Sequence, residues 1–206
     1  MAWQDQSVRW GNIAALTIFS MEAGLVFLMT IYLQDVLHVG PLTTGLVFGV
    51  PGLASVAAGV VAGRIIARQG ARPVLLAALL VQGGLTAPLI LLGAESSWVW
   101  LLVPALFVGF LGHITAVVAA TVIATSDVAD ADAGLATGLV TTSQRVAVTV
   151  GIPLLGAVMV TRADLLAGIH LALLVDVVLT LAVVATIMAG LKRPSRRAGP
   201  RGPMRS

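Results

Sequence analysis

The chain has 206 residues, of which 58% are hydrophobic and 10% charged, and its formal net charge at pH 7 is +3. Soluble domains carry about 25% charged residues, so this composition excludes a soluble protein, which would expose apolar patches larger than soluble monomers tolerate. A transmembrane helix needs roughly 20 apolar residues, and the chain therefore has room for about six spans and no appended soluble domain.

Six apolar stretches, each bounded by charged residues or by glycine and proline, follow one another along the chain. We expect each to form a transmembrane helix, at about residues 12–37, 43–67, 73–93, 98–125, 134–161 and 164–191. Residues 1–11 are expected to form a cytoplasmic segment without a cleavable signal, and residues 192–206 a disordered basic tail. The predicted fold is an all-α integral membrane bundle. We expect the prolines at 51, 88, 104 and 153 to kink their helices without breaking them.

The basic residues of the loops predict the orientation of the bundle. With a cytoplasmic N-terminus, the cytoplasmic segments hold Arg64, Arg68, Arg72 and the basic tail, whereas the external loops hold only Arg162. An excess of Lys and Arg marks cytoplasmic loops, and acidic residues count little, so the acidic loop at 127–132 is compatible with the same side. We therefore expect a multi-pass protein of the cell membrane with both termini in the cytoplasm.

A short pattern, Gly-Leu-x-x-Gly, opens both the second apolar stretch at 45–49 and the fifth at 134–138. In the predicted topology these two stretches cross the membrane in opposite directions. Such an echo indicates a 3+3 inverted repeat, as in each six-helix half of some secondary transporters.

Four ionisable residues lie well inside the predicted spans: Glu22, His113, Arg145 and Asp176. Charged groups inside a bilayer are costly, so these residues are candidates for function. At a rise of 1.5 Å per residue, the first three lie near one level in the middle of the membrane, and Asp176 lies somewhat further out.

Each of these candidates allows more than one role. Glu22 is either a structural acid that pairs with Arg145 or the proton-carrying group of a transporter, because a desolvated carboxylate holds its proton more readily. His113 is either a hydrogen-bonding partner of a neighbouring helix or a proton relay, and Arg145 is a structural hydrogen-bonding residue. Asp176 either faces the bundle or pairs across a subunit interface.

Signatures of enzymes and of metal or cofactor sites are missing from the sequence. It contains no HExxH, GxSxG or GxxxxGK[ST] motif, it has no cysteine, and its three histidines lie in separate segments. We therefore expect no catalysis, no cofactor and no metal. Most of the basic excess lies in the tail, so the expected partners are the lipid bilayer, protons and a small-molecule substrate, and not nucleic acid.

Several phrases of the sequence resemble one family of membrane proteins. Tyr-Leu-Gln at 32–34, Gly-Pro-Leu-Thr-Thr-Gly-Leu at 40–46 and Pro-Gly at 51–52 resemble a helix-to-loop passage of the major facilitator superfamily, in particular of its fourteen-helix drug–proton antiporter branch. Ala-Gly-Leu-Ala-Thr-Gly-Leu at 133–139, followed by Ser-Gln-Arg at 143–145, resembles the entry into the penultimate helix of that branch. The resemblance covers nearly the whole chain and points to the C-terminal half of such a transporter.

The stretch from Gly63 to Arg72 is similar to the cytoplasmic loop motif GxxxDRxGRR of the superfamily. Gly63, Arg68, Gly70 and Arg72 match, but Ala67 stands at the acidic position. This departure suits the weaker copy of the motif that is usual in C-terminal halves, and it argues against a gating charge pair in this loop.

The resemblance implies the C-terminal half of a proton-driven exporter of small amphipathic or cationic molecules that acts by alternating access. Such a transporter needs two six-helix halves. The chain would then be either part of a longer protein or a half-size protein that pairs with a missing N-terminal half or a second membrane chain. The alternative function is that of a non-transporting membrane protein that assembles with or regulates another membrane protein.

Overall fold

The computed structural model describes residues 6–125 and 133–191. Its long helices are α1 (Gln6–Ile31), α2 (Pro41–Gln69), α3 (Ala71–Thr86), α4 (Val99–Thr125), α5 (Ala133–Met159) and α6 (Leu165–Leu191). Within these described residues, six helical segments are long and apolar enough to cross a membrane. The all-α bundle expected from the sequence is therefore confirmed. The acidic loop and the basic tail lie outside the described residues, so the expectations placed on them stay predictions.

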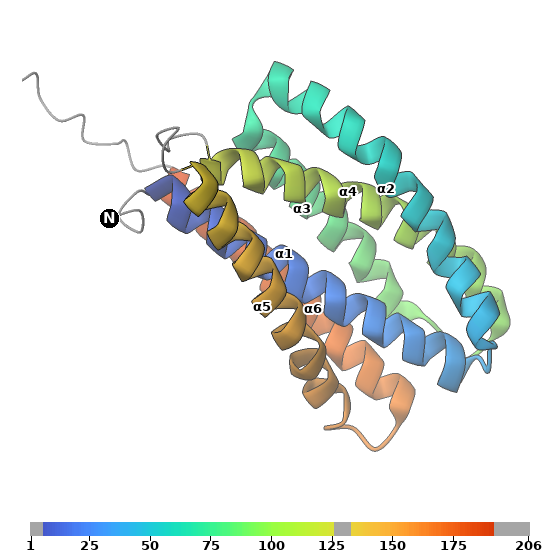
Figure 1. The fold of residues 1–206 in the computed structure, drawn as a ribbon. Helices are drawn as coiled ribbons and strands as arrows, with labels where there is room; N and C mark the ends of the chain where they lie inside the picture. Colours follow the sequence, from blue (N-terminus) through green and yellow to red (C-terminus); the bar gives the residue numbers. More distant parts are fainter. Residues whose placement is uncertain (1–5, 126–132, 192–206) are drawn as a thin grey trace, which may run out of the picture.

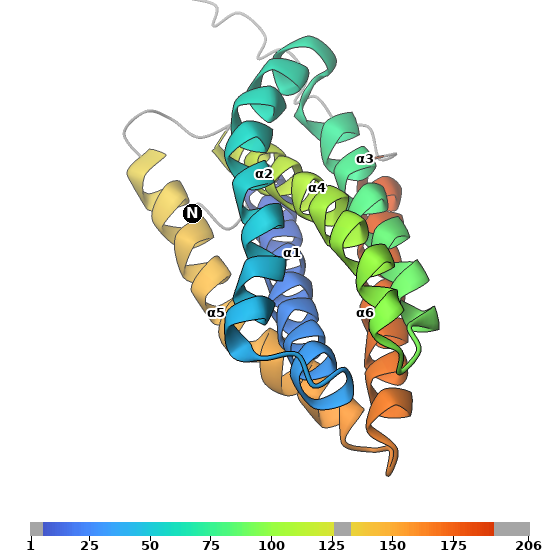
Figure 2. The same cartoon turned by 90° about the vertical axis from the view of Figure 1, so that its right-hand side faces the viewer.

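The helices gather into two groups of three. One group contains α1, α5 and α6, the other contains α2, α3 and α4, and contacts of α1 with α4 and of α3 with α6 join the groups (Figures 1 and 2). The α2–α3 corner, which carries Arg64, Arg68 and Arg72, lies at the same end of the bundle as the start of α1 (Figure 1). We call this end the basic end, and the other the opposite end.

The packing of the helices has the symmetry of an inverted repeat. The exchange pairs α1 with α4, α2 with α5 and α3 with α6. Under this exchange the contact of α1 with α5 corresponds to that of α4 with α2, and the contact of α1 with α6 corresponds to that of α4 with α3. All four contacts are present. Because two long helices lie between the members of each exchanged pair along the chain, the two members run in opposite directions. The arrangement is therefore that of a 3+3 half bundle.

The third predicted span differs from the helix that is observed. It was expected to continue as one kinked helix past Pro88, but α3 ends at Thr86 and the chain continues as a 3₁₀ helix, η3 (Ala87–Leu91). Pro88 has no backbone N–H to donate to the carbonyl oxygen of Gly84, so the α-helical hydrogen-bond pattern is interrupted here. Pro51, Pro104 and Pro153 lie inside α2, α4 and α5, as expected.

Small residues bring α1 and α5 together closely. The Ser20 hydroxyl donates a hydrogen bond to the carbonyl oxygen of Ala147, at 2.9 Å. Gly151, one turn further along α5, lies against the backbone of Ser20, so that a Cβ at this position would collide with it. Both Ala147 and Gly151 are buried. This contact sets which face of α5 points at α1.

Hydrogen bonds also tie the opposite end of the bundle. After α1 the chain forms a short π-helix, η2 (Tyr32–Val36), and the buried Tyr32 hydroxyl donates to the carbonyl oxygen of Gly93 at 2.7 Å. From α6, His170 Nε2 donates to the carbonyl oxygen of Leu92 at 2.8 Å. The end of α1, the segment after η3 and the beginning of α6 are thus joined at one place.

Candidate functional site

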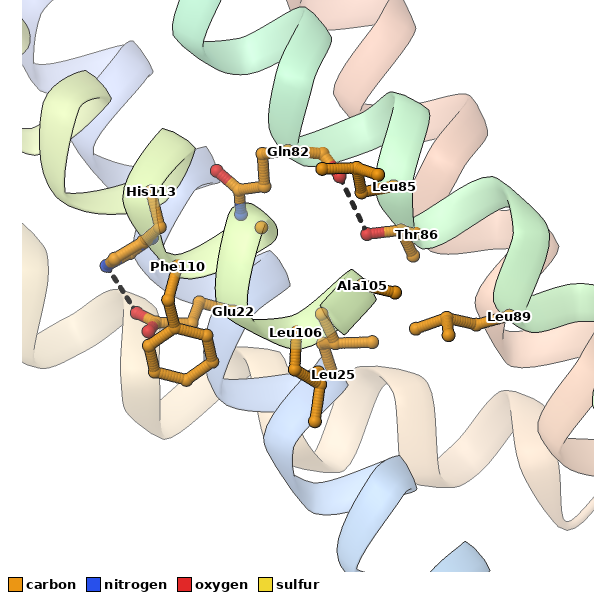
Figure 3. Close-up of a pocket in the computed structure, with 11 residues that line it drawn as sticks. Glu22, Leu25, Gln82, Leu85, Thr86, Leu89, Ala105, Leu106, Phe110 and His113 are labelled. Atoms are coloured by element: carbon orange, nitrogen blue, oxygen red, sulfur yellow. Dashed lines mark hydrogen bonds and ion pairs between the residues drawn. The ribbon is translucent and has the colours of Figure 1, made fainter. Parts of the chain in front are cut away.

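An ion pair between Glu22 and His113 lies in the middle of the bundle. Glu22 Oε2 contacts His113 Nε2, joining α1 to α4 (Figure 3). The histidine side chain is 4% exposed and the glutamate side chain 19%. Two of the four ionisable residues that the sequence singled out are therefore brought into direct contact, as their similar depth along the chain permits.

The pattern of apolar residues explains where the two side chains lie. Ile18, Met21, Leu25 and Leu28 are buried and recur at helical spacing along α1, so they define its core-facing stripe. Glu22 follows Met21 at the edge of this stripe, which leaves part of its carboxylate accessible. On α4, His113 follows Gly112, whose bare Cα lies so close to α3 that a Cβ would crowd the backbone of Ala78 and Gln82.

Aromatic rings surround the histidine. The Phe19 ring lies edge-on to the His113 ring, with centroids 5.4 Å apart and planes at 85°, and the Phe110 ring lies 6.4 Å away. Rings at this range attract a positive charge over their faces, and their apolar bodies keep water away. The pair is thus held in an environment in which a change of protonation matters more than it does in water.

A small cavity lies next to the pair. It measures about 10 Å³ and is lined by Glu22, His113, Gln82 and Thr86 together with apolar side chains (Figure 3). Two buried atoms of these lining residues, His113 Nδ1 and Gln82 Oε1, have no hydrogen-bonding partner within the part of the chain that the structure describes. A water molecule needs a space of about 10–15 Å³ and two or more polar partners, and this cavity comes close to both requirements.

Gln82 and Thr86 were not among the residues predicted from the sequence. Gln82 is 5% exposed and Thr86 2%, and the Thr86 hydroxyl donates to the Gln82 carbonyl oxygen at 3.0 Å, one turn apart on α3. The sequence signal was present, because Gln82 is a polar residue well inside the third apolar stretch. Because its side chain is uncharged, the cost of burying a charge in the membrane does not single it out.

Arg145 does not pair with Glu22, which corrects one of the two roles considered for the glutamate. The two helices are adjacent, but Arg145 is exposed on α5 and forms no ion pair with the described residues. Successive helical residues turn by about 100°, so Arg145, two residues before Ala147, points about 160° away from the face that packs on α1. The hydroxyls of Thr141, Thr142 and Thr149 are also exposed and bond to the backbone of α5 itself.

Asp176 is buried in α6, at 3% exposure, and its Oδ1 atom has no hydrogen-bonding partner among the described residues. Thr180, one turn later, is buried as well and packs against Gly83 of α3. This position favours the alternative in which Asp176 faces the bundle, and it argues against pairing across a subunit interface. Asp176 is not among the residues that line the cavity beside Glu22.

The residues of the predicted loop motif form the corner between α2 and α3. Gly63, Arg68 and Arg72 are exposed, and Gly70 joins the helices with a φ of 86°. Neither arginine forms an ion pair with a described residue. Among the described residues, no group of three or more His, Asp or Glu is arranged to hold a metal ion.

These features define a class of protein. Six membrane-length helices packed as an inverted repeat, with an ion pair between two of them at mid-bundle, are typical of one half of a secondary transporter.

The comparison with protein families agrees. The family model of the Major Facilitator Superfamily matches residues 11–205, so the chain belongs to this superfamily. Members of the superfamily are transporters and not enzymes. No curated protein is significantly similar to the chain.

Proposed function

We propose that the chain is the C-terminal half of a proton-coupled secondary transporter that exports small amphipathic or cationic compounds by alternating access. The observation that carries this proposal is the Glu22–His113 pair, which joins two helices of the bundle beside a water-sized cavity. The likeness of the sequence to the fourteen-helix drug–proton antiporters supports the same assignment.

The pair has the chemistry that coupling requires. With one proton the two groups together are neutral, either as imidazolium and carboxylate or as imidazole and carboxylic acid. Without that proton the pair carries one negative charge, which would attract a cationic substrate.

The two side chains have different access to water. Glu22 is partly exposed and would exchange protons with a hydrated pathway, whereas His113 is almost fully buried among Phe19, Phe110 and the cavity. A water between His113 Nδ1 and Gln82 Oε1 would satisfy both atoms and extend the hydrogen-bonded chain to α3. Proton binding at Glu22 would thus change hydrogen bonds that join α1, α4 and α3.

An uncovered polar face on α5 supports the need for a second half. Arg145 lies near the middle of α5 and is exposed together with Thr141, Thr142 and Thr149. An arginine facing lipid at the centre of a membrane costs about 2.5–3.5 kcal/mol. This face is therefore better suited to a hydrated pathway or to another protein than to the bilayer.

Helix α2 offers a second uncovered surface, which is rich in glycine. Five glycines on one flank of α2 have no described residue within 4 Å of the place where a Cβ would stand: Gly45, Gly49, Gly52, Gly59 and Gly63. Bare helix surfaces of this kind let another helix approach closely in a membrane. We infer that a second six-helix half in the same orientation covers α2 and α5, as the two halves of the superfamily do. The partner is either an N-terminal half or a second membrane chain.

The proposed setting is the cell membrane, with the basic end in the cytoplasm. Arg64, Arg68 and Arg72 then lie on the cytoplasmic side, as the excess of basic residues in cytoplasmic loops requires. Both termini lie on that side as well. The monomeric chain alone is expected to insert into the membrane without supporting transport, because one half cannot close a pathway from both sides.

The test uses a tandem protein in which two copies of the chain are joined end to end, which the shared side of both termini allows. Everted membrane vesicles with an acidic interior receive ethidium as the cationic probe, and a pH-sensitive dye follows the loss of the gradient. We expect ethidium to discharge the gradient with the tandem protein. The variants Glu22→Gln and His113→Gln should lose this response, and the control Glu95→Gln, at an exposed acid of the opposite end, should keep it.

Two outcomes would speak against the proposal. If Glu22→Gln discharged the gradient as well as the unchanged protein, Glu22 would have no part in coupling. If the purified monomer alone supported robust transport, a second half would not be needed.

A further inference from the structure

A second, larger cavity lies between α2, α3 and α4 in the basic half of the bundle. It is an open groove of about 410 Å³, separate from the cavity beside Glu22. Its walls are almost entirely aliphatic, and they include Ala57, Val61, Ile65, Val74, Ala78 and Val81. The proposed function makes no use of it.

The groove arises from the way in which the helices diverge. After their corner at Gly70, α2 and α3 contact one another only weakly and separate, with α4 between them (Figure 2). Ala57 and Ala78 have small side chains, so the space between the three helices is left open. Val61 and Val81 remain 47% and 41% exposed along its walls.

The length of the groove corresponds to one leaflet of a bilayer. From Ala57 to Gln69 it follows α2 for about 18 Å, at 1.5 Å per residue. Half of the hydrocarbon core of a membrane measures about 15 Å. The groove therefore reaches from the membrane surface at the basic end to about the middle of the bilayer, which is the space that one acyl chain occupies.

Two arginines lie on α2 near the end of this groove that faces the basic end of the bundle. Ala57, Val61, Arg64 and Arg68 follow one another at spacings of four, three and four residues, and therefore lie along one face of α2. Both arginines are exposed, and neither forms an ion pair with a described residue. No acidic residue occurs between positions 36 and 94, so α2 and α3 themselves carry no counter-charge.

We propose that this groove binds one anionic phospholipid, with an acyl chain along its aliphatic wall and the phosphate on Arg64 and Arg68. Arginine presents a planar fork of donors that matches phosphate oxygens, and basic pockets between helices at a membrane surface select anionic head groups. The aliphatic wall would hold any phospholipid, and the arginines supply the preference for negative charge.

Arg72 provides an internal control. It belongs to the same corner and carries the same charge, but on α3 it lies about 160° around the helix from Val74, away from the groove. A general attraction of anionic lipid to the basic end would depend on all three arginines alike. A bound lipid in the groove depends on Arg64 and Arg68 and not on Arg72.

The experiment is native mass spectrometry of the full chain released from nanodiscs that contain equal amounts of phosphatidylglycerol and phosphatidylcholine. We expect one retained phosphatidylglycerol per chain. Arg64→Gln and Arg68→Gln should each lower its apparent affinity about fivefold, as expected for a basic residue near the surface. Arg72→Gln should have little effect, and inorganic phosphate at the same concentration should not displace the lipid.

A second pair of variants tests the wall of the groove. Ala57→Phe fills it from an exposed position and should reduce retention of both lipids, whereas Leu53→Phe, on α2 outside the groove, should not. Thermal unfolding of each variant verifies that it is folded. Equal retention of the two lipids by the unchanged chain would overturn the proposal. A preference for phosphatidylglycerol that survives in the folded Arg64→Gln/Arg68→Gln variant would do the same, as would an equal loss in Arg72→Gln.

Discussion

The Glu22–His113 contact makes a stability prediction that separates it from the pairing with Arg145. We consider the variants Glu22→Leu, His113→Phe and both together. In the first, His113 Nε2 loses its partner, and Nδ1 already has none. In the second, the Glu22 carboxylate loses the partner of its Oε2 atom and is left beside the small cavity. A buried polar group without a partner costs about 1–3 kcal/mol, so each single variant should lose stability by this amount.

The double variant should recover most of the loss. Replacing a whole buried ion pair by apolar side chains of similar volume is often neutral or stabilising. The Phe that replaces His113 also keeps a ring beside Phe19 and Phe110, whose centroids lie 5.4 and 6.4 Å from the present ring. The coupling free energy of the cycle is therefore expected to be about 2–6 kcal/mol, the sum of the two single penalties that the double variant avoids.

Thermal unfolding of the purified chain in nanodiscs measures these differences. For a protein of this size, 1 kcal/mol shifts the Tm by about 2–4 °C, so each single variant should melt several degrees lower. In the control cycle of Glu22→Leu with Arg145→Leu, the two effects should add to within about 0.5 kcal/mol. Additive effects of Glu22→Leu and His113→Phe, or rescue of Glu22→Leu by Arg145→Leu, would refute the reasoning.

Two further predictions concern the orientation and the packing of the helices. The chain has no native cysteine, so single cysteines can be introduced as labels. A cysteine at Glu95 should react with an impermeant maleimide added outside the cell, and one at Gln69 only after permeabilisation. Reaction at Gln69 from outside would show that the bundle has the opposite orientation. Gly151→Ala should lower the free energy of unfolding by about 1–3 kcal/mol because its methyl group meets the backbone of α1. Gly49→Ala, at an open position of α2, should raise the free energy of unfolding by about 0.5–1 kcal/mol. If Gly151→Ala and Gly49→Ala changed the Tm equally, the close contact of Gly151 with α1 would be contradicted.

The sequence alone determined that the fold is a bundle of membrane-spanning helices, and it limited the candidate site to a few ionisable residues. Apolar stretches long enough to span a bilayer can only become helices there, because backbone groups in lipid must bond within their own segment. A constant rise per residue also put Glu22 and His113 at a similar depth before any contact was known. Even the end of α3 at Thr86 was encoded locally, by Pro88, although we expected a kink at this position.

The tertiary structure alone decided which side chain meets Glu22. Depth along the membrane left His113 and Arg145 equally eligible, and α5, which carries Arg145, does pack against α1. The choice depends on how each helix is rotated about its axis. The close contact of Gly151 with Ser20 turns Arg145 outward, and the contact of Gly112 with α3 fixes how α4 faces its neighbours. Rotation follows from the fit of surfaces on different helices, which no single stretch of sequence contains.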